Sequence, residues 1–191
     1  MAQLVYAAIC SIDGYTEDAG GKFDWARPDE QVHAAVNAVE REIGTYVYGR
    51  RMYETMRYWE TVDTASAPAV AAEYAEIWRA TDKIVYSRTL DDVSSGRTRL
   101  ERHFDPDALR ALARAADRNV SIGGATLAGA ALAAGVLDEC HLIVVPVAVG
   151  GGLPALQPGG LVGFELLDQR RFDNGTVMLS YRVAGGAPRV A

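Results

Sequence analysis

The feature of this sequence that most limits its fold is an apolar stretch near the N-terminus. From Leu4 to Ile9 every residue is apolar or aromatic. A strand with one solvated face alternates between apolar and polar residues, whereas a near-continuous apolar run is typical of a strand covered on both faces. The segment from Gln3 to Ile12 is therefore expected to be a central strand of a sheet with a layer on each side.

Short strands and helices alternate along the rest of the chain. Apolar, β-branched runs predict strands, and apolar residues spaced three and four apart predict helices. The expected strands are 45–48, 83–86, 98–100, 119–122 and 139–149, and the expected helices are 28–43, 50–59, 68–79, 105–116 and 125–134. Pro146 lies inside the longest of these strands and suggests an edge position or a bulge, because proline has no N–H to donate.

Cap and turn residues mark the ends of several elements. Asp105 is the expected N-cap of one helix, and Gly135 is the expected C-terminal cap of another. Near the C-terminus two expected strands, 164–172 and 176–183, flank the sequence Asp173-Asn174-Gly175, which is typical of a β-hairpin turn.

This order of elements predicts an α/β fold. Repeated strand–helix units give a three-layer domain with a central, mostly parallel mixed sheet, flanking helices and a C-terminal antiparallel hairpin. The chain has 191 residues, of which 49% are hydrophobic and 23% are charged, and this suits one globular domain. We expect the domain to span residues 1–184 and residues 185–191 to form a flexible tail.

The net charge of the chain and the spacing of its cysteines limit the classes of function and the cellular location that we expect. The net charge of -6 disfavours nucleic-acid binding driven by bulk charge. Cys10 and Cys140 lie far apart with no paired spacing, which predicts reduced thiols in a cytoplasmic protein. No segment has the pattern of a signal peptide or of a bilayer helix, so no membrane association is expected.

The sequence contains none of the common catalytic motifs. The histidines, His33, His103 and His141, share no metal-ligand spacing, so no metal site is expected. There is no G-x-S-x-G motif for a serine nucleophile and no G-x-x-x-x-G-K-[ST] motif for a phosphate loop. Covalent acyl transfer and P-loop chemistry are therefore excluded.

Three segments that follow expected strands have features of anion-binding sites. They are Tyr48-Gly49-Arg50-Arg51-Met52, Tyr86-Ser87-Arg88-Thr89 and Ile122-Gly123-Gly124-Ala125-Thr126. Backbone N–H groups at a helix start can face a phosphate, and glycine permits close approach. Each segment alone also fits a plain strand end with solvated arginines or a tight turn. Because neighbouring parallel strands end at one edge of a sheet, the three together suit a ligand with two or three phosphates.

These segments occur in a wider pattern that is found in one family. Ser11-Ile12-Asp13-Gly14-Tyr15, residues 24–30 and residues 146–152 join them in the same order. The chain resembles the stand-alone reductases of the dihydrofolate reductase-like superfamily, which are similar to the C-terminal reductase domain of the bifunctional riboflavin-biosynthesis deaminase-reductase. The resemblance covers about Leu4 to Val183. It implies an NADPH-dependent oxidoreductase, similar to dihydrofolate reductase or to 5-amino-6-(5-phosphoribosylamino)uracil reductase, and a homodimer.

The resemblance also assigns residues to the NADPH site. By this resemblance the pyrophosphate and the adenosine ribose would be met by Gly49, Arg50, Arg51 and Met52. The 2′-phosphate would be held by Ser87 and Arg88. The other side of the pyrophosphate would be lined by Gly123, Gly124, Ala125 and Thr126. By the same likeness Ala7, Ala8, Asp13 and Gly14 would lie near the nicotinamide. An arginine at the 2′-phosphate fits because its planar fork can bind phosphate through two parallel hydrogen bonds.

The proton donor is expected among three residues. Folate reductases carry a carboxylate early on the first helix, shortly after a tryptophan, and Trp25 followed by Glu30 resembles that spacing. Glu30 is therefore the candidate acid, with His33 and Asp13 as the other catalytic candidates. The alternatives are that Glu30 is simply favoured by the helix dipole in a first turn and that His33 is a surface residue.

Departures from the family pattern leave the substrate open. The segment from Tyr58 to Asp63 is acidic, where folate reductases carry a basic residue for the folate tail, so folate is disfavoured. The expected reaction is hydride transfer from NADPH to a C=N or C=O bond of a small heterocyclic or conjugated substrate. The alternative is a cofactor-binding or sensing module without turnover. The apolar strand from Leu142 to Val149 is expected either at a dimer interface or in the core.

Overall fold

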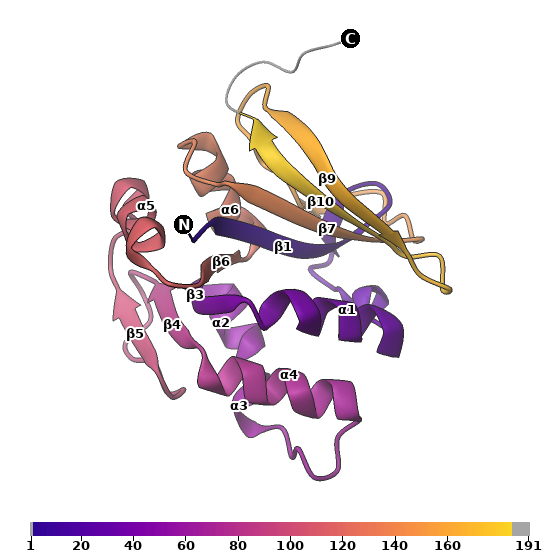
Figure 1. Ribbon diagram of the computed structural model, residues 1–191, viewed down its shortest axis with the longest axis horizontal. Coiled ribbons are helices and arrows are strands. Elements are labelled where there is room, and N and C mark those ends of the chain that lie inside the picture. Colours follow the sequence, from indigo (N-terminus) through magenta and orange to yellow (C-terminus); the bar gives the residue numbers. More distant parts are fainter. Residues whose placement is uncertain (1, 185–191) are drawn as a thin grey trace.

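The apolar N-terminal segment forms β1 (Leu4–Ser11), which lies inside an eight-stranded sheet in the computed structural model of the protein (Figure 1). The structure describes residues 2–184, and the predicted tail, 185–191, lies outside the described residues. β1 pairs in parallel with β6 (Asn119–Gly123) on one side and with β7 (Glu139–Val145) on the other. The prediction of a central strand is confirmed.

The sheet is mixed but mostly parallel. Its remaining strands are β3 (Ile43–Gly49), β4 (Asp82–Tyr86), β5 (Thr98–Glu101), β9 (Gly163–Arg171) and β10 (Val177–Ala184). The strand order is β5-β4-β3-β6-β1-β7-β10-β9. The strands from β5 to β7 in this order run parallel, and the hairpin of β9 and β10 adds to β7 in antiparallel orientation.

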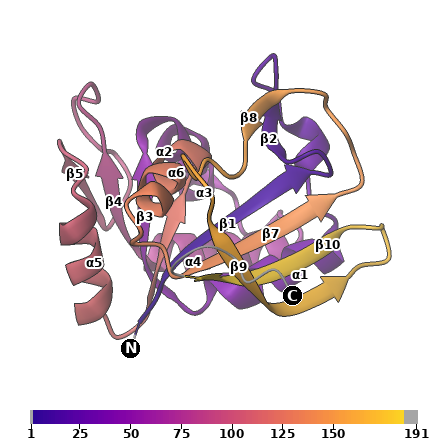
Figure 2. The same ribbon diagram turned by 90° about the horizontal axis from the view of Figure 1, so that it is seen from above.

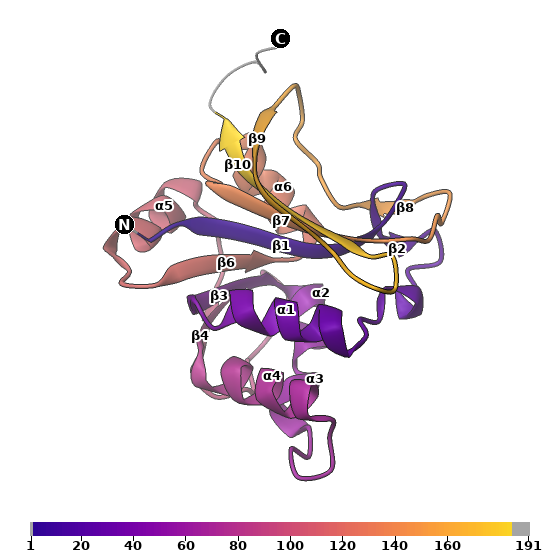
Figure 3. The ribbon, with the colours of Figure 1, turned by 45° about the vertical axis from the view of Figure 1, so that its right-hand side comes forward.

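Helices cover both faces of the sheet, as a three-layer fold requires (Figure 3). The helices are α1 (Glu30–Glu40), α2 (Arg50–Met56), α3 (Tyr58–Thr61), α4 (Ala69–Ala80), α5 (Pro106–Ala115) and α6 (Ala125–Ala133), with a 3-10 turn, η1 (Asp24–Ala26). One core cluster joins α5 and α6 to β1 and β6, and two others join α1, α2 and α4 to the opposite face. The predicted α/β architecture is confirmed.

Side-chain caps explain where several helices start. The Asp105 carboxylate accepts hydrogen bonds from the N–H groups of Asp107 and Ala108, which confirms the predicted N-cap of α5. Gly135 follows α6 with a φ of +66°, a left-handed conformation that favours glycine. The Asp29 carboxylate caps α1 by accepting from the N–H of Val32, so this helix starts at Glu30 and not at the predicted residue 28. It ends at Glu40, and Ile43 is already the first residue of β3.

The predicted strand 139–149 is shorter than expected and lies elsewhere in the sheet. β7 ends at Val145, and Pro146 follows it without entering the ladder. β7 lies between β1 and β10, so both of its edges are paired and the predicted edge position is wrong. The same pairing leaves neither edge of β7 open for a second copy of the chain, so the core alternative for this strand is favoured.

Two short strands that the sequence patterns did not predict form a separate sheet. β2 (Tyr15–Asp18) pairs in antiparallel orientation with β8 (Gly152–Pro154), beyond the carboxyl end of β1 (Figure 2). Gly150, Gly151 and Gly152 all have positive φ values, and a Cβ on Gly152 would collide with the Glu17 carbonyl. Glycine at this point therefore lets the chain pass close enough for β8 to pair with β2.

A cluster of polar groups is buried between α1, α4 and β3. Glu40 contributes a carboxylate, and Tyr46, Tyr48 and Tyr74 contribute aromatic rings and hydroxyl groups. The Tyr48 hydroxyl accepts a hydrogen bond from Trp78 Nε1 at 3.2 Å. Burial raises the pKa of Glu40 to about 7, and the nearby Tyr46 hydroxyl offsets part of that rise.

The two cysteines and the hydropathy of the helices are further features of the described chain. Cys10 and Cys140 are both buried and unbridged, as predicted. Within residues 2–184, none of the helices has the length and apolar character needed to cross a lipid bilayer.

Candidate functional site

The three predicted anion-binding segments meet at one edge of the sheet. β3 lies between β4 and β6 and runs parallel to both. Near its end Tyr48 is aligned with Gly123 of β6, and Gly49 is aligned with Tyr86 of β4. The residues that follow these strands, 50–52, 87–89 and 124–126, are therefore neighbours at the carboxyl edge, where parallel sheets bind ligands.

Gly49 is a glycine that neither packing nor backbone geometry demands. It is the N-cap of α2 with a φ of -79°, a value that any residue adopts, and a Cβ placed on it would meet no atom within 4 Å. The absent side chain leaves open space against the backbone at the start of α2. A phosphate group could approach the N–H groups there closely, so this position fits a nucleotide cofactor.

The glycines after β6 have a structural explanation. A Cβ on Gly123 would lie 2.6 Å from the Tyr48 ring, and Gly124 has a φ of +97° and packs close to Met52. Both glycines therefore allow α6 and β6 to pack against the start of α2. Ala125, the first residue of α6, is buried, whereas Thr126 is exposed beside it.

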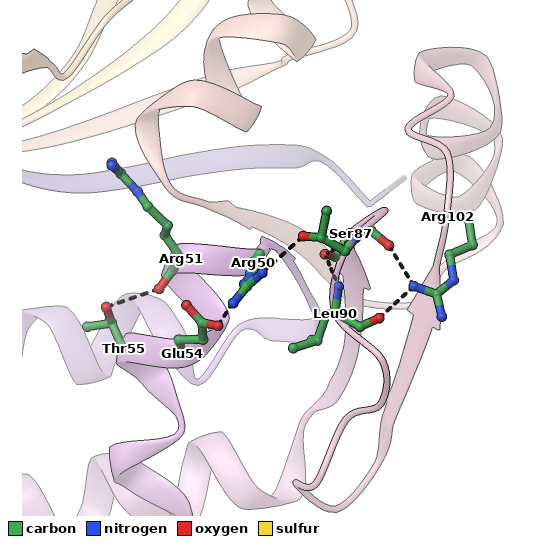
Figure 4. Close-up of polar contacts among 8 residues, drawn as sticks. Arg50, Arg51, Glu54, Thr55, Ser87, Leu90 and Arg102 are labelled. Atoms are coloured by element: carbon green, nitrogen blue, oxygen red, sulfur yellow. Dashed lines mark hydrogen bonds and ion pairs between the residues drawn. The ribbon is translucent and has the colours of Figure 1, made fainter.

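Arg50 links two of the three segments. Its Nε donates to Glu54 Oε1 at 2.8 Å within α2, and its NH1 donates to Thr89 Oγ1 at 3.0 Å in the loop after β4. Figure 4 shows Arg50 directed toward this loop and Arg51 directed away from it. Thr89 was part of the predicted segment, but nothing in the sequence indicated that it would bind Arg50.

The second segment leads into a loop, whereas the first and the third lead into helices. β4 is followed by an irregular loop that runs to β5. The buried Ser87 hydroxyl accepts hydrogen bonds from the N–H groups of Thr89 and Leu90, which closes a turn at the start of this loop. The Ser87 oxygen is thus engaged within its own loop.

Arg102 is a functional-site residue that the sequence analysis missed. From the end of β5 its guanidinium donates to the carbonyl oxygens of Ser87 and Leu90, at 3.2 and 2.6 Å, and so fixes the loop that carries Arg88 (Figure 4). Its place in the sequence, fifteen residues after Ser87, carries no motif. Only the parallel pairing of β4 with β5 brings it to this loop.

Arg88 and Arg51 differ in what they contact. Arg88 is exposed, and no hydrogen bond or ion pair joins it to another residue in the described part of the chain. Arg51 forms an ion pair with Glu17 of β2, with 2.8 Å between NH2 and Oε1. Arg50, Arg51 and Arg88 lie in segments that meet at one edge of an otherwise acidic chain. Glu54 and Glu17 pair with the first two, so the three guanidinium groups and two carboxylates leave one net positive charge to attract an anion.

Asp13 anchors one loop to another. Its carboxylate accepts hydrogen bonds from the N–H groups of Val149 and Gly150, at 3.1 and 2.7 Å, in the glycine-rich loop before β8. A hydrogen bond from Ser11 and those from the loop lower the pKa of Asp13. A carboxylate held in its ionised form is an acceptor, so this geometry favours an anchoring role for Asp13 over a role as proton donor, which stays a prediction.

The two other acid–base candidates lie on α1. Glu30 is its first residue and is exposed, and it forms no hydrogen bond or ion pair within residues 2–184. His33 packs against the rings of Trp59 and Tyr74, at 6.0 and 5.8 Å between centroids, toward α3 and α4. Burial lowers the pKa of His33, and the charge of Glu73 opposes this. Glu30 thus lies at the start of the helix, and His33 faces α3 and α4; the catalytic roles of both residues stay predictions.

Ala7 and Ala8 lie in the middle of β1, where they are aligned with His141 and Leu142 of β7. Both side chains are small and half-buried, and Ala8 packs against the core cluster beneath α6. Their predicted place near a nicotinamide stays a prediction.

Comparison with known proteins places the chain in a family and a fold. The family model described as the RibD C-terminal domain matches residues 2–178. A candidate riboflavin biosynthesis protein from Shewanella sp. PV-4 aligns with a TM-score of 0.75 and 19% identity, over 96% of this chain and 99% of that one. A pyrimidine reductase-like protein from Corynebacterium diphtheriae aligns with a TM-score of 0.69 and 16% identity, over 97% and 93% of the two chains.

A dihydrofolate reductase has the same fold. The enzyme from Enterococcus faecalis, in a complex with NADP(H), aligns with a TM-score of 0.61 and 15% identity, over 96% of this chain and 97% of that one. At these identities the likeness shows a shared fold. The predicted dihydrofolate reductase-like architecture and the predicted family resemblance are both confirmed.

Proposed function

The chain belongs to the RibD C-terminal domain family, and from this premise we propose that it is an NADPH-dependent reductase of a small heterocyclic or conjugated substrate. Family and fold support a reductase-type function, and NADPH and the substrate class are the proposed refinement. The observation that carries the proposal is the open space at Gly49, set among three arginines at the carboxyl edge of the sheet.

The arrangement of the arginines supports a cofactor with separate phosphate groups. In the proposed complex Gly49 and Arg51 face the pyrophosphate, while Gly123 and Gly124 bring α6 close on the other side. Arg88 receives the 2′-phosphate, because its guanidinium is exposed and its loop is fixed from behind by Arg102. The Ser87 hydroxyl positions this loop, and its remaining capacity is one O–H donor.

The reaction requires little of the protein beyond binding and orientation. When bound, the nicotinamide supplies the hydride that goes to a C=N or C=O carbon of the substrate. The small side chains of Ala7 and Ala8 leave room at β1, and Asp13 holds the glycine-rich loop in place. We propose that Glu30, directly or through a water molecule, delivers the proton to the substrate heteroatom, because its carboxylate is exposed and engages no described group.

Titration of the purified protein with NADPH and, in parallel, NADH tests this proposal. Calorimetry is expected to show binding at one site per chain with a clear preference for NADPH. A substrate screen that begins with dihydrofolate and pyrimidinones then separates an enzyme from a sensing module, since a sensing module binds the cofactor without turnover. If neither dinucleotide binds, the reductase proposal is wrong. The predicted homodimer is an independent expectation, checked by the mass of the protein in solution.

A further inference from the structure

The ion pair between Arg51 and Glu17 joins two parts of the molecule that are otherwise separate. Arg51 is the second residue of α2, and Glu17 lies on β2, in the small sheet beyond β1 (Figure 2). Within residues 2–184 no other hydrogen bond or ion pair joins a side chain of α2 to β2. The Arg51 side chain is 71% exposed and that of Glu17 is 22% exposed. The carboxylate is therefore the more buried partner, and the guanidinium is the partner that solvent and a ligand can reach.

Several contacts hold Glu17 in position. Its backbone pairs with Leu153 of β8, and the neighbouring Thr16 hydroxyl donates to the Leu153 carbonyl at 3.2 Å. Gly152 passes so close to the Glu17 carbonyl that no side chain would fit there. Because β8 follows the loop that Asp13 anchors, the Glu17 carboxylate is presented to Arg51 by a firmly attached unit.

The ion pair between Arg50 and Glu54, within α2, differs from the pair between Arg51 and Glu17. Its carboxylate partner, Glu54, lies one turn further along α2 and moves with it. Glu17 instead lies on β2, so any group that takes Arg51 away from Glu17 removes the side-chain ion pair between α2 and β2. A carboxylate oxygen 2.8 Å from the guanidinium occupies the place that a phosphate oxygen would take.

We propose that Glu17 is a built-in competitor for the cofactor, whose carboxylate holds Arg51 until a phosphate of the dinucleotide replaces it. The inference rests on the proposed function. An exposed ion pair stabilises the fold very little, and phosphate carries more charge and matches the guanidinium fork, so the exchange favours the phosphate. Glu17 thus lowers cofactor affinity, and the exchange removes the ion pair between α2 and β2 when the cofactor binds.

The test compares dissociation constants for NADPH and NADH by calorimetry in four proteins: wild type, Glu17→Gln, Arg51→Gln and the double variant. Glu17→Gln is expected to bind both dinucleotides about threefold to tenfold more tightly, because the pyrophosphate is common to both. Arg51→Gln is expected to weaken both about tenfold. In the Arg51→Gln background, Glu17→Gln is expected to leave both dissociation constants unchanged. If the role of Glu17 were merely structural, its substitution would have the same effect with and without Arg51.

A matched control separates this effect from a general change in charge. Glu165→Gln removes a carboxylate from another exposed ion pair, with Arg182 at 2.8 Å, on the hairpin at the far end of the sheet. It is expected to leave both dissociation constants unchanged. Unchanged or weaker binding by Glu17→Gln, with normal binding by the wild type, overturns this inference and leaves the proposed function standing. Absence of binding in every variant overturns the proposed function and the inference with it.

Discussion

Charged groups occur in two contrasting settings in this molecule. At the carboxyl edge of the sheet Arg50 and Arg51 pair with Glu54 and Glu17 where solvent reaches both partners. Between α1, α4 and β3 the carboxyl group of Glu40 is buried among tyrosines, and no cation pairs with it in the described part of the chain. Exposed pairs exchange partners at little cost, whereas the charge state of a buried group is linked to folding. The first setting suits ligand binding, and the second sets how stability responds to pH.

The largest expected effect is on the buried side of this comparison. Glu40 binds its proton more tightly in the folded protein, with a pKa of about 7, than in the unfolded chain, where an ordinary glutamate titrates near 4.3. As pH rises between these two pKa values, the unfolded state releases the proton first and the free energy of unfolding falls, by about 4 kcal/mol in total. Below this pH range Glu40 does not lower the free energy of unfolding, and above the range the decrease is complete.

Glu40→Gln is expected to remove this pH dependence. Urea unfolding at pH 5, 6, 7 and 8 should show the variant gaining stability relative to wild type with each step, up to about 3 kcal/mol. Glu42→Gln changes an exposed carboxylate two residues away and serves as the control. Parallel pH profiles for wild type and Glu40→Gln would show that burial does not raise the pKa of Glu40 as described.

A smaller effect, on dinucleotide binding, is expected from Arg88→Ala at the exposed carboxyl edge of the sheet. If Arg88 receives the 2′-phosphate, its loss should weaken NADPH binding about tenfold and leave NADH binding unchanged, because only NADPH carries that phosphate. Thermal unfolding should not change, since Arg88 contacts no described side chain through a hydrogen bond or ion pair. Equal losses for the two dinucleotides, measured by calorimetry, would refute the assignment of Arg88.

The smallest effect is expected from Gly49→Thr. Threonine is an acceptable N-cap and suits the extended backbone of Gly49, so stability should stay within about 0.5 kcal/mol of wild type. The added side chain fills the space open to the ligand, and binding of both dinucleotides should weaken about fivefold. By contrast, Gly123→Ala should lower the melting temperature, because its Cβ would meet the Tyr48 ring. Unaltered binding by Gly49→Thr would contradict the placement of the cofactor.

Much of the fold was predictable because it depends on local patterns. The uninterrupted apolar run of β1 indicated a central strand, and Asp105 indicated the start of α5 through its side-chain cap. Gly175 of the predicted hairpin turn has a φ of +84° and connects β9 and β10 as expected. In each case the residue type and its immediate neighbours decide the conformation, and distant contacts agree with it.

The remainder depends on contacts between distant residues. β2 and β8 are only four and three residues long, and their pairing requires the close approach of Gly152 to Glu17, which no local pattern shows. The interior position of β7 follows from the return of β10, not from its own sequence. Site residues follow the same rule. The arginines at the edge could be predicted, whereas Arg102 and Glu17 enter the site only through strand pairing and tertiary packing, as does the contact of Thr89 with Arg50.

The central position of β1 also affects how the chain is made. Leu4 is aligned with Val120 and Val5 with Glu139, so each partner of the first strand emerges from the ribosome long after the strand itself. Contacts between residues so far apart in sequence form slowly, and the apolar strand stays uncovered until they do. Folding during synthesis is therefore expected to wait for the last third of the chain, and the stretch from Leu4 to Ile9 is where a chaperone of nascent chains would bind in the meantime.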